Sequence, residues 1–86
     1  MFVKFTAEEI NFTKKALVPF ATAKTELIVK VVEKFNSYEG ETLAEVHGKE
    51  LNCLYELIYK FDTENTEMQN NLLELIENLL MGWNGK

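Results

Sequence analysis

His47, Glu50 and Cys53 are the residues whose types and spacing come nearest to a chemical site in this chain. A thiol nucleophile, an imidazole base and a carboxylate that orients the base form a known catalytic combination. On a helix, however, Cys53 lies six positions after His47, which places their Cα atoms about 9 Å apart along the axis. The imidazole would not reach the thiol proton, so we predict no catalytic residues and a protein that is not an enzyme.

His47 and Glu50 alone could share a metal ion, because residues three apart lie on the same side of a helix. Di-iron helical bundles use Glu-x-x-His from each of two helices together with two further glutamates. This chain has one histidine, and the histidine precedes the glutamate. Such a site stays open unless a second copy supplies more ligands, so we predict no metal and no cofactor.

Two interpretations of the His47 and Glu50 pair then remain. The first is a half-exposed hydrogen bond near the start of a helix, worth a few tenths of a kcal/mol. The second is a polar contact buried in the seam of a homodimer, where it would fix the register of two helices. Both interpretations require the pair to lie on one helix.

That helix is predicted over residues 43–61. Thr42 with Glu45 three residues later has the spacing of a capping box. Gly48 costs about 1 kcal/mol in a helix interior, but the apolar pattern continues through it. At about 100° per residue, one side of the helix collects Leu43, Val46, His47, Glu50, Leu51, Leu54, Leu57, Ile58 and Phe61.

A first helix is predicted to begin at Ala7, after a second capping box made by Thr6 and Glu9. Its end is ambiguous because of Pro19, which costs about 3 kcal/mol inside a helix. The apolar pattern continues past this proline without a loop-forming residue nearby. We therefore prefer one helix over residues 7–37 that is kinked at Pro19, with two helices meeting at a corner as the alternative.

A last helix is predicted over residues 66–81, again with capping-box spacing, between Thr66 and Gln69. Its apolar side holds Met68, Leu72, Leu75, Ile76 and Leu79, and Leu73 and Leu80 widen that side beyond one packing stripe. Met1 to Phe5 is the only candidate strand. The predicted fold is therefore all-α, a single domain over residues 1–86 that forms a small antiparallel bundle of three helices, or four if Pro19 breaks the first.

The charge argues against nucleic acid as a partner. The formal net charge is −5 and the chain has no arginine, the residue that makes bidentate contacts to guanine and phosphate. Residues 36–86 hold ten acidic side chains against three lysines. The lysines of the first half scatter around their helix, so we interpret them as solvated. One cysteine and no apolar run of about 18 residues predict a soluble, cytoplasmic protein with no membrane partner.

The apolar surface exceeds what three helices of this size need for one core, so we expect a homodimer that binds another, unidentified protein. The candidate interface residues are Phe12, Phe20, Tyr38, His47, Glu50, Leu73, Leu80 and Trp83. The alternative for each is bundle core for Phe12, Phe20, Leu73 and Leu80, and tolerated exposure for Tyr38 and Trp83.

A second functional hypothesis is an acidic inhibitor that presents its carboxylates to a nucleic-acid-binding protein in place of phosphates. In general make-up, an acidic helical chain with nine lysines, no arginine and no metabolic motif is similar to small proteins of phages and bacterial mobile elements. That similarity is one of composition and rests on no motif.

Overall fold

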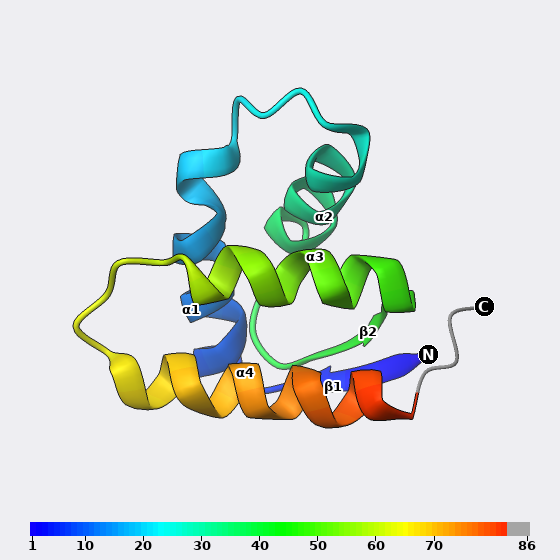
Figure 1. Cartoon of the computed structure of the whole chain (residues 1–86), viewed down its shortest axis with the longest axis vertical. Helices are drawn as coiled ribbons and strands as arrows, with labels where there is room; N and C mark the ends of the chain where they lie inside the picture. The colour runs from blue at the N-terminus through cyan, green and yellow to red at the C-terminus, as the bar shows by residue number, and fades with distance from the viewer. Residues whose placement is uncertain (83–86) are drawn as a thin grey trace.

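The computed structural model describes residues 1–82, which form four α-helices, one 3-10 turn and a two-stranded antiparallel sheet (Figure 1). The prediction of an all-α bundle is therefore wrong. In chain order the elements are β1 (Phe2–Phe5), α1 (Ala7–Leu17), the 3-10 turn η1 (Val18–Phe20), α2 (Glu26–Asn36), β2 (Thr42–Glu45), α3 (Gly48–Tyr59) and α4 (Thr66–Met81). No helix in this part of the chain combines the length and the apolar character that a membrane span requires.

The sheet pairs the candidate strand at the start of the chain with a segment that we predicted to be helical. Phe2 lies opposite Glu45 and Phe5 opposite Thr42. Along both strands the side chains alternate between core and solvent, with Val3, Phe5 and Ala44 buried. A helical pattern and a strand pattern coexist in residues 42–46, and pairing with β1 decides in favour of the strand.

The helix predicted over residues 43–61 accordingly begins five residues late, at Gly48. Thr42 and Glu45 lie in β2 and cap nothing. The backbone N–H of His47 instead donates to Glu50 Oε1 at 2.9 Å, so the return half of a capping box forms one turn further along. Placing glycine at the first helical position also removes the interior penalty that the predicted helix would have carried.

Pro19 breaks the first helix, so the preferred single helix over residues 7–37 is wrong and the alternative of two helices is correct. α1 ends at Leu17, Pro19 lies in η1, and α2 begins only at Glu26. Proline is acceptable in the first turn of a helical segment, where its missing N–H has no partner to lose. The broken chain lets α2 fold back over α1 and α3 (Figure 1).

The start of α1 and both ends of α4 agree with the predictions. α1 begins at Ala7 with the Thr6 and Glu9 capping box in place. α4 spans Thr66–Met81, the predicted range, but its cap is the Asn65 side chain, which accepts from the Met68 N–H at 3.2 Å. Gln69 does not cap this helix; its amide donates to the carbonyl oxygen of Phe61 at 2.8 Å and to that of Ile58 at 2.9 Å.

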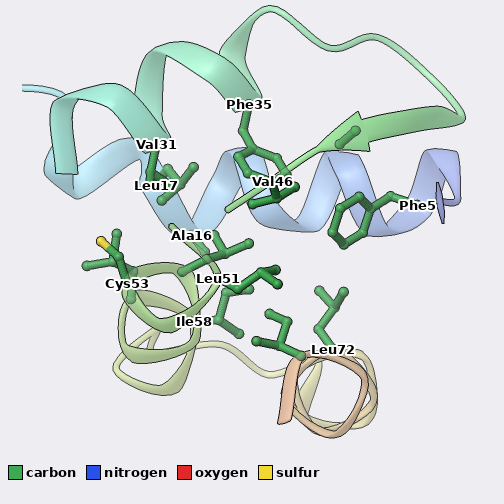
Figure 2. Close-up of a cluster of buried hydrophobic side chains, with 14 of the residues drawn as sticks. Phe5, Ala16, Leu17, Val31, Phe35, Val46, Leu51, Cys53, Ile58 and Leu72 are labelled. Atoms are coloured by element: carbon green, nitrogen blue, oxygen red, sulfur yellow. The ribbon is translucent and has the colours of Figure 1, made fainter. Parts of the chain in front are cut away.

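The core gathers apolar side chains from both strands and all four helices (Figure 2). Phe5 from β1 meets Phe35 from α2 edge to face, with ring centroids 5.7 Å apart. α3 lies at the centre and α4 packs antiparallel beside it (Figure 1). α4 contributes only two fully buried side chains, Leu72 and Ile76.

Candidate functional site

Lys34 and Glu50 form the most concentrated polar cluster in the described residues. Lys34 Nζ lies 2.8 Å from Glu50 Oε1 and also donates to the carbonyl oxygen of Glu45 at 2.9 Å. Glu50 Oε1 additionally accepts from the His47 N–H. The Glu50 side chain is 9% exposed and that of Lys34 is 26% exposed. One lysine of α2 therefore ties together the end of β2 and the first turn of α3.

The pKa of Glu50 reflects two opposing influences. Burial alone would raise it, because a carboxylate is less well solvated inside the protein. The hydrogen bonds from Lys34 and from the His47 N–H, together with the positive charge of Lys34, outweigh burial, so the pKa of Glu50 lies below its ordinary value. Glu50 is thus held as an anion with its charge compensated, which describes a structural ion pair.

The geometry offers no catalytic triad around this cluster. His47 is exposed, whereas Cys53 is buried on the apolar side of α3 (Figure 2). Burial raises the pKa of the Cys53 thiol, and the negative charges of Glu56 and Glu50 act in the same direction. A thiol in this environment is a poor nucleophile. Within residues 1–82, no three His, Cys, Asp or Glu side chains come together as metal ligands.

Two shallow hollows lie on the surface of residues 1–82. One, of about 300 Å³, lies between α1 and the connection from α3 to α4 and is lined by Glu8, Asn11, Phe12, Lys15, Phe61, Thr63, Asn65 and Met68. Another, of about 240 Å³, lies on the outside of α3 and is lined by Tyr55, Glu56, Tyr59 and Lys60. In neither hollow does a hydroxyl side chain form a hydrogen bond with a carboxylate or a lysine, the contact by which a base would activate a nucleophile; the Thr63 hydroxyl instead accepts from the Asn65 N–H at 3.1 Å.

The outer surface of α4 carries apolar side chains that the core leaves partly or largely exposed. Leu73 and Leu80 are half-buried at the edge of the core, and Met81 is 79% exposed. Leu73 and Leu80 lie seven residues apart, which places them two turns apart on the same side of the helix. We call Leu73, Leu80 and Met81 the α4 ridge. Residues 61–82 contain no lysine, and all of their acidic side chains are exposed: Asp62, Glu64, Glu67, Glu74 and Glu77.

The structure distributes the predicted interface residues over different environments. Phe12 is buried, 5.3 Å from the Phe61 ring, so it takes the alternative role of core residue. Phe20 and Tyr38 are half-buried against the core, and Tyr38 meets Phe35 edge to face at 5.3 Å. The His47 backbone N–H bonds to Glu50, but the two side chains differ: that of His47 is exposed and that of Glu50 pairs with Lys34. Only Leu73 and Leu80 share a face, and Trp83 lies outside the described residues.

Sequence reasoning missed Lys34 and the exposed face of the sheet. Lys34 was assigned to solvent, yet on a helical projection it lies within about 60° of Val31, a buried position. This position beside a buried residue could have indicated, from the sequence alone, that Lys34 lies next to the core. The sheet exposes Phe2 and Leu43, at 66% and 65%. Neither could be placed on an outer face while residues 42–45 were assigned to a helix.

No protein-family model, no curated protein and no solved structure matches the chain. The role proposed below therefore rests on the geometry described above.

Proposed function

We propose that this protein is a non-catalytic interaction module whose α4 ridge binds a basic amphipathic helix of another protein. The observation that carries the proposal is the combination, on one helix, of apolar side chains left at the surface and an acidic rim without a lysine. The single reduced cysteine fits a reducing compartment such as the cytoplasm.

The apolar part of the proposal rests on the width of the α4 apolar side. Helices that bind in a groove present anchors at spacings of three, four and seven residues, and Leu73 and Leu80 have that spacing. Both pack against the edge of the core and keep part of their surface exposed, whereas Leu72 and Ile76 are fully buried. A partner helix laid along the ridge would bury the remaining surface of both leucines.

The acidic side chains of α4 determine which kind of partner fits this surface. Glu74 and Glu77 are exposed on the same two turns that carry Leu73 and Leu80, on the side of the two leucines away from the core. A second copy docked ridge to ridge would bring acidic rims together, and like charges facing one another oppose binding. A helix with lysines or arginines flanking its apolar stripe has the complementary charge. The partner at this surface is therefore a different, basic chain.

A titration with a designed peptide tests the proposal. The probe is an amphipathic peptide with leucines at the apolar positions of a helical repeat and lysines elsewhere, and its control is a scrambled peptide of identical composition. We expect the ordered peptide to bind about tenfold or more tightly than the scrambled one, because only the ordered peptide has an apolar stripe. Calorimetry at about 0.15 M salt measures both affinities.

Matched variants assign the binding to the ridge. Leu73→Gln with Leu80→Gln should weaken binding about tenfold or more, since anchors at the centre of an interface carry most of its energy. Val18→Gln removes a 68% exposed apolar side chain that lies outside α4 and should leave binding unchanged. Equal binding of the scrambled peptide, or equal loss in all variants, would contradict the proposal.

The same acidic rim supports one second candidate, inhibition of a nucleic-acid-binding protein by mimicry of phosphates. In that case the charges rather than the leucines would dominate. Binding of a basic partner would fall steeply between about 0.05 M and about 0.5 M salt, and Glu74→Gln with Glu77→Gln would weaken it more than the leucine variants do.

A further inference from the structure

The edge of β1 is an unused hydrogen-bonding surface. The Val46 N–H donates to the carbonyl oxygen of Met1 at 2.8 Å, and the Met1 amine donates to the carbonyl oxygen of Val46. In an antiparallel ladder such pairs alternate with pairs that point away from each other. With the observed register, Val3 and Phe5 therefore bond to β2, while the backbone N–H and C=O groups of Phe2 and Lys4 point away from it. No third strand covers them in the described part of the chain.

The two edges of this sheet differ in the hydrogen bonds made by their outward backbone groups. On β2 the outward carbonyl oxygen of Glu45 accepts from Lys34 Nζ at 2.9 Å, so a side chain of α2 occupies one end of that edge. On β1, no hydrogen bond from the described residues reaches the outward groups of Phe2 and Lys4. β1 is thus the edge at which the outward groups of both residues remain available for pairing.

The usual protection of an edge strand is weak at β1. Outward lysines, prolines and bulges discourage edge-to-edge pairing. β1 contains no proline, and its register with β2 runs without a bulge. It does contain Lys4, but Lys4 Nζ lies 2.9 Å from Glu41 Oε1, so its charge is balanced within the same copy. Beside it, Phe2 is 66% exposed on the outer face of the sheet.

We propose that the β1 edge pairs with the β1 edge of a second copy, antiparallel about a two-fold axis at Val3, so that two copies share one four-stranded sheet. This register places Phe2 of each copy opposite Lys4 of the other. All outward N–H and C=O groups of the two residues are then satisfied, with four hydrogen bonds across the axis. The register is self-complementary, as a two-fold interface requires.

The side chains on the outer face fit the same register. Phe2 of one copy stands directly across from Lys4 of the other, an arrangement in which the apolar stem of the lysine covers the ring while its ammonium stays paired with Glu41. No like charges stand directly opposite one another across the axis. On the inner face Val3 meets Val3 of the second copy.

The pairing is expected to be weak. A strand of four residues buries far less than the roughly 1,200 Å² of a stable protein interface. The dimer should therefore form and dissociate with protein concentration. This second copy is a different occupant of a different surface from the partner proposed for the α4 ridge, and either proposal can fail alone.

Sedimentation equilibrium over a range of concentrations, together with edge variants, tests the pairing. Lys4→Pro removes one outward N–H per copy, half of the four new hydrogen bonds, and should weaken self-association about tenfold or more. Leu43→Pro places a proline at an outward position of β2 and should leave self-association unchanged. Lys4→Ala retains the backbone N–H and should weaken self-association by about threefold at most, through loss of the side-chain contact with Phe2. Circular dichroism checks that each variant folds.

A measurement on the unmodified protein keeps the test independent of the variants. In a mixture of isotope-labelled and unlabelled copies, a filtered nuclear Overhauser effect between the Val3 Hα atoms of two copies is expected, because these atoms face each other in the proposed register. A monomer at every concentration, a dimer without this contact, or a dimer equally stable with Lys4→Pro would overturn the proposal.

Discussion

Lys34 on α2 and Glu50 on α3 form an ion pair with Nζ and Oε1 2.8 Å apart, and the same Nζ also binds the last residue of β2. Three consecutive elements of the chain meet at this lysine. Because the carboxylate is almost fully buried, removing the lysine would leave a charge with poor solvation.

We predict that Lys34→Met lowers the free energy of unfolding by about 2 kcal/mol, since one partner of a buried pair is left without compensation. The double variant Lys34→Met with Glu50→Gln should recover part of that loss. Urea denaturation measures both. Lys30→Met is the matched control, because the 3.5 Å pair of Lys30 with Glu26 is exposed and such pairs contribute about 0.5 kcal/mol or less.

The lowered pKa of Glu50 predicts a pH dependence of stability. A carboxylate whose pKa is lower in the folded state stabilises the fold above its ordinary pKa, near 4.5, and this contribution disappears as the pH falls through the folded-state value. The difference in stability between the unmodified protein and Glu50→Gln should therefore be largest near neutral pH and shrink as the pH falls below the ordinary pKa of 4.5. A constant difference over that range would show that Glu50 is not held as an anion.

Gly40 is the described residue with a positive φ, 68°, in the turn that leads into β2. We predict that Gly40→Ala costs about 1 kcal/mol, although a Cβ there would meet no neighbouring atom, because the left-handed conformation itself is unfavourable for alanine. Gly82→Ala serves as the control, since Gly82 has a φ of −88° and a Cβ would lie 3.7 Å from its nearest neighbour. Thermal unfolding of both variants should separate strain from crowding.

Thr13 on α1 is fully buried, and its Oγ1 has no hydrogen-bond partner in residues 1–82. Thr13→Val keeps the shape and removes the unsatisfied hydroxyl, so we expect it to stabilise the protein by about 1 kcal/mol. Thr13→Ser keeps the hydroxyl and loses a methyl group, and it should destabilise by a similar amount. Stabilisation by neither variant, or by serine alone, would mean that the hydroxyl is satisfied.

Local sequence patterns predicted the start of α1 and the bounds of α4, but not the other helix boundaries or the sheet. Thr6 with Glu9 places the start of α1 correctly, because this capping box is satisfied by neighbouring residues alone. Thr42 with Glu45 has the same spacing and fails, because residues 42–45 pair with a strand about forty residues earlier. That pairing is a long-range contact that no local periodicity contains.

In the candidate sites too, features that depend on local sequence patterns could be predicted, and features that depend on long-range contacts could not. Leu73 and Leu80 could be identified as surplus to one packing stripe, since the width of an apolar side is visible in the sequence alone. The outward edge of β1 could not be identified, because it depends on β2. The partner of Glu50 was missed for a related reason: Lys34 reaches it only after the break at Pro19 folds α2 back over α3.

Chemical-shift mapping tests the central claim, binding at the α4 ridge, most directly. The amphipathic leucine and lysine peptide is titrated into ¹⁵N-labelled protein, and the backbone amide shifts are followed. The account predicts that the largest changes cluster at Leu73, Glu77 and Leu80, that they are reduced with the scrambled peptide, and that the outside of α3 changes little. Shifts spread evenly over the surface, or centred on the hollow beside Tyr55 and Tyr59, would contradict it.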